Sequence, residues 1–217
     1  MTNFLLTKSR AGRFANLLYT TIYPSKCLFC RRVLDGAELY CSNCQATTAD
    51  MEHYTEHVGW LYAPFAYESE VAGVVHRFKY GGARALAKPM AQAICTHFPD
   101  IYGDFLVPVP LHPNRLRQRG FNQAAHLAME LSEILNLPVF DGLERLRETA
   151  KQFDLAREQR MTNLAGAMGI KTGFDVAEKH ILLVDDIFTT GATANDCARA
   201  LLEAGAKQVD MIAFARA

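Results

Sequence analysis

Long hydrophobic runs and an excess of charge are both missing from this chain of 217 residues. No stretch of eighteen or more apolar residues occurs, which excludes a transmembrane helix from the expected elements. The N-terminus also lacks a long apolar stretch followed by a small-residue cleavage site, so we expect no secretory signal. The sequence therefore predicts a cytoplasmic protein that does not insert into a membrane.

Net charge is absent as well, because 23 Lys and Arg residues balance 23 Asp and Glu residues. Bulk charge therefore gives no indication of nucleic-acid binding. Internal repeats and low-complexity tracts are also missing. Charge is uneven only locally: residues 1–34 contain six basic residues and no acidic one, which suits either a basic patch or a solvated face.

The chain has enough apolar material for a sizeable core, since half of its residues are hydrophobic. Strand and helix patterns alternate in its larger part, which indicates an α/β fold with a parallel sheet and helices on both faces. We expect strands over 61–67, 105–109, 181–184 and 209–214, and helices over 71–79, 84–97, 120–135 and 194–204.

Two parts of unequal size are expected along the chain. Residues 1–50 hold an amphipathic N-terminal helix, over 3–20, and a cysteine-rich module. Residues 46–60 read as a connection, and the α/β domain occupies 60–217.

Four cysteines fall in two close pairs, Cys27 with Cys30 and Cys41 with Cys44, ten residues apart. Cysteines of a cytoplasmic protein are reduced, so clustered ones are typical metal ligands rather than disulfides. This spacing predicts a four-thiolate tetrahedral zinc site. Sulfur fills all four corners of such a site, so its role is structural rather than catalytic.

Other interpretations of the cysteines and nearby histidines stay open. Either Cys-x-x-Cys pair suits a redox role, although neither has the strand-to-helix setting of redox motifs. His53 and His57 are one helical turn apart and are alternative zinc ligands. Cys95 and Cys197 lie in helical patterns and are expected to be small core residues.

The most informative stretch begins with four aliphatic residues at 181–184, which predict a strand buried on both faces. Two adjacent acids, Asp185 and Asp186, end this run, and a helical pattern starts at about Ala194. The loop between them consists of Thr189, Thr190, Gly191, Ala192 and Thr193, after two hydrophobic residues. Ligands bind at the carboxyl ends of parallel strands, and helix N-termini bind phosphate. The segment therefore offers acids for hydroxyls or a metal beside a cradle for phosphate, and a sugar phosphate fits both.

This stretch resembles the PRPP-binding motif of type I phosphoribosyltransferases, where PRPP is 5-phosphoribosyl 1-pyrophosphate. The resemblance implies that Asp185 and Asp186 hold the 2′ and 3′ hydroxyls of the ribose. It implies that the loop from Thr189 to Thr193 takes the 5′-phosphate, and that Mg²⁺ accompanies PRPP. A buried strand whose acids merely cap a turn is the alternative interpretation.

A second loop follows strand 105–109 and contains His112 and three alternating arginines, Arg115, Arg117 and Arg119. The helix expected from residue 120 would carry these cations at its start, where the helix dipole disfavours them. That conflict suggests that they bind an anion, and a solvated basic face is the alternative. In the type I family a pyrophosphate-binding loop lies here, which implies this role for His112, Arg115 and Arg119.

A third segment, residues 143–163, is basic and shows no strong strand pattern. The resemblance implies a flexible loop that closes over PRPP from about this position, which would exclude water from the reacting carbon. Arg147, Lys151 and Arg160 are the candidate lid residues, and Arg145, Gln152, Arg157 and Asn163 belong to the same segment. A surface helix with salt bridges explains the segment equally well.

Together, these features resemble the ComF (ComFC/GntX) family over nearly the whole chain. The resemblance is carried by the four cysteines, the Val-Pro-Val-Pro-Leu-His segment before Pro113, residues 119–123, residues 147–163 and the PRPP motif. It implies a type I phosphoribosyltransferase fold with a zinc module, and an association with DNA uptake in natural competence or with the use of DNA as a nutrient.

One position departs from the 6-oxopurine phosphoribosyltransferases. They carry an aspartate before Thr-Gly to manage a proton on the purine, whereas this chain has Thr189, which has no pKa suited to a general base.

The sequence as a whole leaves two hypotheses for the function. The protein is an enzyme that transfers phosphoribose between PRPP and a base or nucleotide. Alternatively, it is a non-catalytic module that binds a nucleotide or single-stranded DNA and acts with a partner such as a DNA-uptake helicase.

Overall fold

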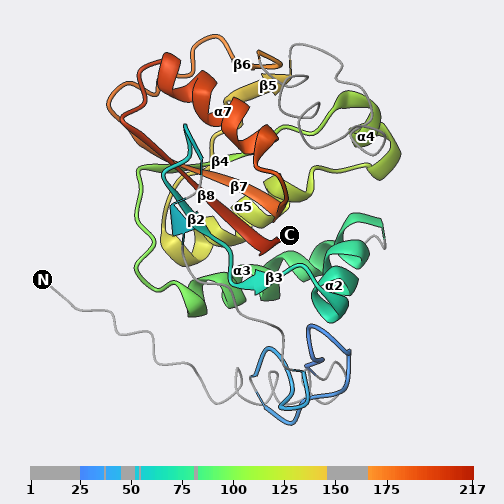
Figure 1. Ribbon diagram of the computed structural model, residues 1–217. Helices are drawn as coiled ribbons and strands as arrows, with labels where there is room; N and C mark the ends of the chain where they lie inside the picture. Colours follow the sequence, from blue (N-terminus) through green and yellow to red (C-terminus); the bar gives the residue numbers. More distant parts are fainter. Residues whose placement is uncertain (1–24, 37, 45–51, 54, 81–82, 146–165) are drawn as a thin grey trace, which may run out of the picture. The chain divides into compact units, whose positions relative to one another are not determined.

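The computed structural model describes residues 25–36, 38–44, 52–53, 55–80, 83–145 and 166–217 (Figure 1). The chain divides into two compact units, Met1–Gln45 and Ala46–Ala217. The helix expected over 3–20 lies outside the described residues. No helix in the described part of the chain is long and apolar enough to cross a membrane.

The larger unit is built on one twisted sheet with the strand order β1-β2-β8-β7-β4, and β3 also pairs with β8. All pairs are parallel except β1 with β2. The strands are β1 (Glu52–His53), β2 (Trp60–Tyr62), β3 (Phe65–Ala66), β4 (Phe105–Pro108), β7 (His180–Phe188) and β8 (Gln208–Arg216). The predicted parallel-sheet α/β fold is confirmed.

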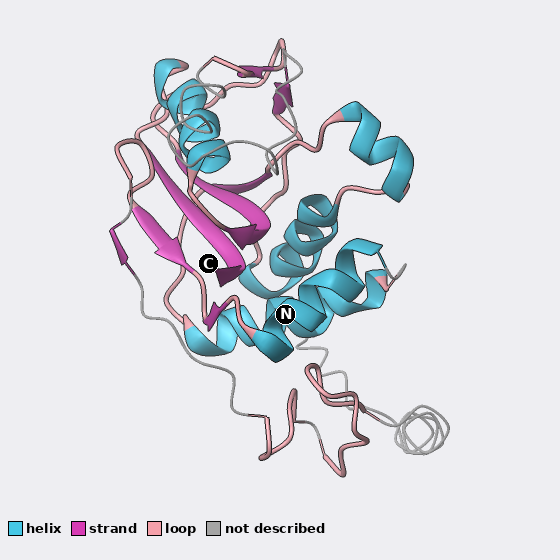
Figure 2. Cartoon of the chain, turned by 45° about the vertical axis from the view of Figure 1, so that its right-hand side comes forward, coloured by secondary structure: helices cyan, strands magenta, loops and turns pink. Residues whose placement is uncertain are grey.

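Helices cover both faces of this sheet (Figures 1 and 2). Helix α7 packs on one face, while α3 and α5 pack on the other. The helical segments are α2 (Ser69–Tyr80), η1 (Arg84–Leu86), α3 (Ala87–His97), α4 (Pro113–Arg119), α5 (Gln123–Leu135) and α7 (Ala192–Glu203). A separate two-stranded sheet pairs β5 (Leu143–Arg145) with β6 (Met168–Ile170).

Strand β7 lies between β4 and β8, and its residues 181–184 are buried. Residues 181–184 are fully buried because both faces are covered by helices, as the aliphatic run predicts. The prediction was wrong about where the strand ends. Pairing with β8 continues to Phe188, so Asp185 and Asp186 lie within the strand.

Two further differences from the expected elements concern residues 113–119 and 143–145. Residues 113–119 form their own helix, α4, with proline in its first turn and Gly120 in the left-handed conformation at its end (φ 75°). Residues 143–145 form a strand that pairs with β6, a non-local contact that local pattern did not reveal. Pro89 marks a boundary, since the 3₁₀ turn η1 precedes it and Pro89 lies in the first turn of α3.

A buried polar cluster joins three segments near the start of β7 and β8. The Asp210 side chain is 1% exposed and accepts hydrogen bonds from the Trp60 N–H (3.0 Å) and from the Gln208 side chain (3.0–3.1 Å). The Nε2 atom of His180 lies 2.8 Å from its Oδ2. Burial alone would raise the pKa of Asp210, but the hydrogen bonds from His180, Gln208 and Trp60 outweigh burial and lower it.

The substitution Asp210→Asn should therefore reduce stability in a pH-dependent way. The lowered pKa in the folded state means that Asp210 contributes stability above the unfolded value, about 3.9, and loses it as pH falls through the folded value. We expect the variant to lose about 1–3 kcal/mol at pH 7 and to show a weaker decline in acid. Urea unfolding between pH 7 and pH 3 measures both effects.

The matched control for this prediction is Asp141→Asn, which removes an exposed carboxylate that pairs with Lys171 at the surface. It should change the unfolding free energy by less than about 1 kcal/mol at any pH in the series. Equal pH profiles for wild type and Asp210→Asn would contradict the prediction.

Candidate functional site

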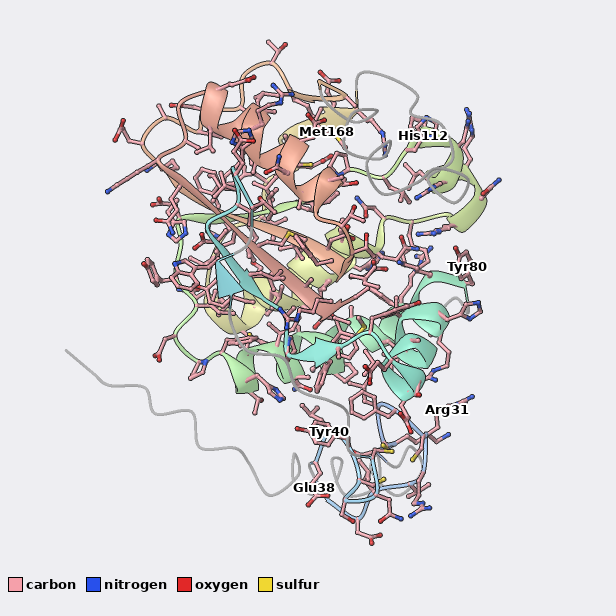
Figure 3. The ribbon with its side chains drawn as sticks, viewed as in Figure 1. Arg31, Glu38, Tyr40, Tyr80, His112 and Met168 are labelled. Atoms are coloured by element: carbon pink, nitrogen blue, oxygen red, sulfur yellow. The ribbon has the colours of Figure 1, made fainter. Side chains whose placement is uncertain are left out.

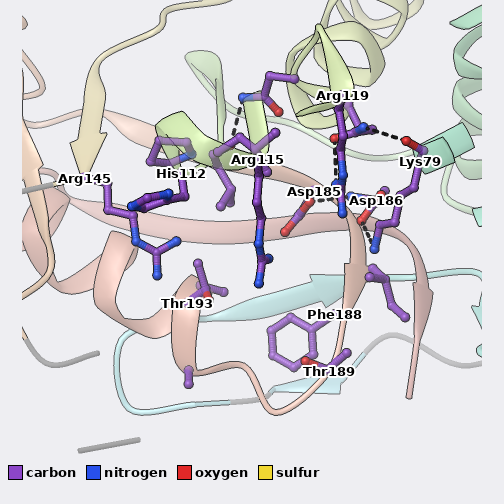
Figure 4. Close-up of a pocket in the computed structure, with 18 of the residues that line it drawn as sticks. Lys79, His112, Arg115, Arg119, Arg145, Asp185, Asp186, Phe188, Thr189 and Thr193 are labelled. Atoms are coloured by element: carbon purple, nitrogen blue, oxygen red, sulfur yellow. Dashed lines mark hydrogen bonds and ion pairs between the residues drawn. The ribbon is translucent and has the colours of Figure 1, made fainter. Parts of the chain in front are cut away.

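A cavity of about 1020 Å³ opens where β4 and β7 end (Figures 3 and 4). Its walls come from the end of α2, the loop after β4, helix α4, β5, and the turn between β7 and α7. Tyr80 at the end of α2 and His112 at the start of α4 lie on the same side of the domain. The volume suits a ligand of the size of a nucleotide.

The two adjacent acids line this cavity but differ in their surroundings. Side chains alternate along a strand, so Asp185 belongs to the α7 side of the sheet and Asp186 to the other side. Asp186 is 3% exposed, and its Oδ1 lies 3.0 Å from Lys79 Nζ of α2. Its Oδ2 is buried and has no hydrogen-bond partner among the described residues. Asp186 is therefore buried within the strand rather than exposed at a strand end.

Asp185 is only partly exposed, and its Oδ1 accepts the backbone N–H of Asp186 at 2.8 Å. Burial, and then the charge of Asp186, raise the pKa of Asp185 to about 7, while the Lys79 ammonium opposes the shift. The ionised pair is therefore costly without additional positive charge or hydrogen-bond donors. A cation or sugar hydroxyls placed against these oxygens would supply what is missing.

The turn after β7 is shaped by Gly191, which adopts a left-handed conformation (φ 73°) as the N-cap of α7. A Cβ atom here would lie 2.6 Å from the Phe188 ring and 3.2 Å from Thr55, so only glycine fits. Among the described residues, no side chain forms an N-cap hydrogen bond on α7 at Gly191, and the Ala192 N–H makes a long contact of 3.5 Å with Thr190 Oγ1. The first turn of α7 thus lines the cavity with backbone donors suited to an anion.

Hydrogen bonds between residues 55–58 and Asn195 of α7 support this turn, and the sequence analysis did not predict them. The Oδ1 atom of Asn195 accepts hydrogen bonds from Thr55 Oγ1 (2.8 Å) and the His57 N–H (3.1 Å). Thr55 Oγ1 also accepts the Val58 N–H, which closes a tight turn over residues 55–58. Nothing in the local sequence pairs residue 195 with residue 55, because the contact spans 140 positions.

The basic wall lies on α4 and β5, and it corrects one argument from the sequence. Arg117 and Arg119 occupy the last turn of α4, where the helix dipole favours cations, so the expected conflict does not exist. Arg115, Arg119 and His112 nevertheless line the cavity, as does Arg117. The Nδ1 atom of His112 accepts the Asn114 N–H at 3.2 Å and caps α4.

Arg145 is a site residue that the sequence analysis had grouped only with the third segment. It lies at the end of β5 and reaches the cavity beside His112 and Arg115 (Figure 4). Burial, and then the charge of Arg115, lower the pKa of Arg145, so two guanidinium groups share one region. An anion placed between them would relieve this repulsion. The lid candidates Arg147, Lys151 and Arg160 lie outside the described residues.

The segment from Arg119 to Gln123 acts as a brace between α2, β4 and α5. Asn122 caps α5 by accepting the Ala124 N–H, and its Nδ2 donates to the Val109 carbonyl group after β4 (3.1 Å). Gln123 is 2% exposed and accepts a hydrogen bond from Arg119 at 3.1 Å. The residues that carry the family resemblance therefore have structural contacts of their own here.

In the smaller unit, the four paired cysteines converge. The sulfur atoms of Cys27, Cys30, Cys41 and Cys44 all lie within 4.8 Å of one another. Backbone hydrogen bonds make each pair a tight turn, with Arg31 N–H to Cys27 O at 2.9 Å and Cys44 N–H to Cys41 O at 3.0 Å. This cluster fits the predicted zinc module, and four sulfurs complete a tetrahedral ligand set without a histidine.

The ionisation of these thiols also points to a cation. Burial would raise the pKa of Cys27, but hydrogen bonds from the backbone of Cys41, Cys30 and Phe29 lower it to about 6. Burial and the neighbouring sulfurs raise the pKa of Cys44 to about 12. Four thiolates this close repel each other, and a divalent cation removes the repulsion. The other two cysteines lie apart, with Cys197 buried in α7 and Cys95 partly exposed in α3.

Magnesium is the second metal that the resemblance implies, and the chain offers suitable ligands for it. Mg²⁺ prefers carboxylate oxygens and phosphate oxygens of a bound substrate. Asp185 has a second carboxylate oxygen besides the one that accepts the Asp186 N–H, and the buried Oδ2 of Asp186 has no hydrogen-bond partner among the described residues. The donor set at this position therefore fits a divalent ion that enters with a phosphorylated ligand.

Comparison with known proteins places this geometry in a family. The model of the phosphoribosyl transferase domain matches residues 119–217. Competence protein F of Haemophilus influenzae is 27% identical over 223 residues, which cover 88% of this chain and 97% of that protein. Competence protein ComFC of Streptococcus pneumoniae is 34% identical over 154 residues, 71% of this chain and 67% of that protein.

Among solved structures, the allosteric regulatory enzyme of purine biosynthesis is similar at 19% identity with a TM-score of 0.43. The match covers 64% of this chain and only 30% of that enzyme, so the chain spans less than a third of its length. A likeness of this degree carries no functional argument. The relatives and the domain match show the family: the chain belongs to the ComF family of phosphoribosyltransferase-like proteins.

Proposed function

We propose that the cavity binds a phosphoribosyl ligand, PRPP or a nucleotide, and that the protein transfers phosphoribose to or from a base. The observation that carries the proposal is that two acids and the first turn of α7 line one cavity. Asp185 and Asp186 accept the ribose 2′ and 3′ hydroxyls, directly or through Mg²⁺. The turn from Thr189 to Thr193 takes the 5′-phosphate with its N–H and hydroxyl groups.

The basic wall supports a role for α4 and β5 on the pyrophosphate side. His112, Arg115 and Arg145 line the cavity, and arginine binds phosphate oxygens with a two-donor fork. Arg119 is held by Tyr80 and Gln123, which leaves it a supporting role at the edge of this site. Mg²⁺, when bound with the ligand, supplies charge that stabilises departing pyrophosphate.

In the proposed reaction the C1–O bond to pyrophosphate breaks and pyrophosphate keeps the electron pair. A lone pair on a nitrogen of the base forms the new C1–N bond, and the proton on that nitrogen passes to solvent. The arginines and the backbone donors hold the two phosphate ends in place while charge shifts toward pyrophosphate. Thr189 supplies no base, so acceptors that need an enzyme carboxylate at this position are disfavoured.

A second candidate function is a binding module without turnover. It is favoured by Thr189 in place of an acid and by the competence proteins among the relatives. In this case the pocket engages a nucleotide or the end of single-stranded DNA, and the module acts with a DNA-uptake partner such as a helicase. Consumption of PRPP in the presence of a series of bases separates the two candidates.

We also propose that the four cysteines bind one structural Zn²⁺. The convergence of the four sulfur atoms and the need to neutralise neighbouring thiolates support this assignment. The ion would contribute to folding of the smaller unit, because a ligand set of this kind is not assembled in an unfolded chain.

Replacing Asp185 with Asn should weaken PRPP binding in the presence of Mg²⁺ by about 10- to 100-fold, since one charged acceptor is lost. The fold should persist because the amide oxygen still accepts the Asp186 N–H. Isothermal calorimetry measures the affinity. Asp175→Asn, an exposed acid outside the cavity, is the control and should bind as wild type does. Unchanged affinity in Asp185→Asn would refute the proposed role of the acids.

Replacing Gly191 with Ala should reduce PRPP affinity by more than about tenfold, because the added methyl group displaces Phe188 and the turn that would hold the phosphate. Gly173→Ala is a matched control. Gly173 also has a positive φ (85°), but a Cβ atom there meets nothing within 4 Å. Both variants should lose about 1 kcal/mol of stability from backbone strain. Equal affinities for the two variants would show that the turn is not the phosphate site.

The purified protein should contain one zinc ion per chain, and Cys27→Ser should lose it. Elemental analysis measures the zinc content, and thermal unfolding of the same samples should show a lower midpoint for the variant. Cys95→Ser removes a cysteine of α3 that lies outside the cluster and should keep the zinc. Full zinc content in Cys27→Ser would contradict the assignment.

A further inference from the structure

The acidic centre of the cavity already contains a cation that the sequence analysis did not identify. Lys79, the penultimate residue of α2, places Nζ 3.0 Å from Asp186 Oδ1 (Figure 4). The Lys79 side chain is 21% exposed and that of Asp186 is 4% exposed. Both residues line the cavity, so the ion pair stands where the proposed ligand would bind.

The backbone of Lys79 is held in place by the brace described above. Gln123 donates from Nε2 to the Lys79 carbonyl group at 3.4 Å, and Arg119 donates to the Gln123 side chain at 3.1 Å. Arg119 also donates to the Tyr80 hydroxyl group at 3.1 Å and lies over its ring at 4.9 Å. These contacts hold the backbone of Lys79 and the side chain of Tyr80 in place. The Lys79 side chain therefore extends to Asp186 from a fixed backbone position.

The neighbouring cations are occupied differently. Arg119 is bound to Tyr80 and Gln123, and Arg115 belongs to the wall beside Arg145. Among the described residues, Lys79 is the only cation within 4.0 Å of the Asp186 carboxylate. A buried carboxylate without a counter-charge is strongly disfavoured, so Lys79 supplies the positive charge that the acids need when no ligand is bound.

We propose that Lys79 is a built-in counter-ion that stands in for the divalent cation at Asp186 and lets the pocket bind a metal-free sugar phosphate. The ligand class is a ribose 5-phosphate or a nucleoside 5′-monophosphate, which lacks the pyrophosphate group that brings Mg²⁺. Metal and ammonium compete for Asp186, so Lys79 also weakens binding of a free divalent ion. The inference rests on the proposed phosphoribosyl site and adds a second ligand state to it.

A purely structural role for Lys79 predicts a different dependence of ligand affinity on metal. If Lys79 only stabilised the fold, its removal would weaken ligand binding equally with and without metal. If it replaces the metal, its removal leaves two uncompensated acids that repel an anionic ligand and attract a divalent ion. The dependence of affinity on Mg²⁺ is therefore the quantity that separates the two roles.

The test uses ribose 5-phosphate as the probe, with calorimetry in EDTA and in Mg²⁺. Wild type should bind in both conditions with affinities within about threefold. Lys79→Met should lose at least tenfold in EDTA, about 1.4 kcal/mol, and recover most of this in Mg²⁺. Lys88→Met removes an exposed lysine of α3 outside the cavity and should match wild type in both conditions.

One further measurement and one further variant serve as controls for this test. Mn²⁺ alone, followed by electron paramagnetic resonance, should bind Lys79→Met at least threefold more tightly than wild type. Lys79→Gln retains an N–H donor for Asp186 without the charge, and it should show the same metal dependence as Lys79→Met. It replaces Lys79→Met if that variant unfolds, as circular dichroism would reveal.

The outcomes distinguish this inference from the proposed function. Equal losses in EDTA and Mg²⁺, or no loss in either, would overturn the role of Lys79 and leave the site assignment standing. A wild type that binds ribose 5-phosphate in neither condition would overturn the site assignment and the inference with it. A metal dependence that grows at least tenfold on removal of the ammonium charge supports the counter-ion.

Discussion

The site depends on one constraint, the placement of strand β7 between β4 and β8. Its fully buried residues 181–184 hold the strand in a parallel register with both neighbours, and that register carries Asp185 and Asp186 to the cavity. The same pairing ends at Phe188, whose ring sets the space that only Gly191 can fill. Core packing and ligand geometry are therefore parts of one arrangement, and a shift of one residue in β7 would turn each of the two acids to the opposite face of the sheet.

Side chains of both charge signs line the cavity, although the net charge of the whole chain is zero. The acids lie between Arg115 and Arg145 on one side and Lys79 and Arg119 on the other. In the proposed arrangement the hydroxyl groups of the ligand meet the acids, and its phosphate groups meet the basic wall and the first turn of α7. This distribution of charge also explains why bulk charge carried no information, since the local field and not the total charge selects the ligand.

Local patterns in the sequence were sufficient for the features that depend on neighbouring residues. The buried run at 181–184, the turn at Gly191 and the spacing of Cys27 and Cys30 are all local, and they predicted a parallel sheet and a convergent cysteine cluster. Helix α4 was not predicted, although Pro113 at its first position and the left-handed Gly120 after its last residue are local signals of a short helix.

Contacts between distant segments could not be predicted in the same way. The pairs Lys79 with Asp186 and Thr55 with Asn195 join positions more than one hundred residues apart, and a single sequence offers no periodicity for them. The same limit applies to β5, whose partner β6 lies beyond a long intervening segment. These contacts supply the counter-charge at the acids, the support behind the turn and the position of Arg145.

The central claim is that the acids of β7 and the first turn of α7 hold the two ends of one phosphoribosyl group. A crystal structure of the full chain with ribose 5-phosphate and Mg²⁺ tests it most directly. The account predicts electron density for the phosphate against the N–H groups of residues 190–193 and for the ribose hydroxyls beside Asp185 and Asp186. A sugar phosphate bound elsewhere, with this cavity holding only water, would contradict it.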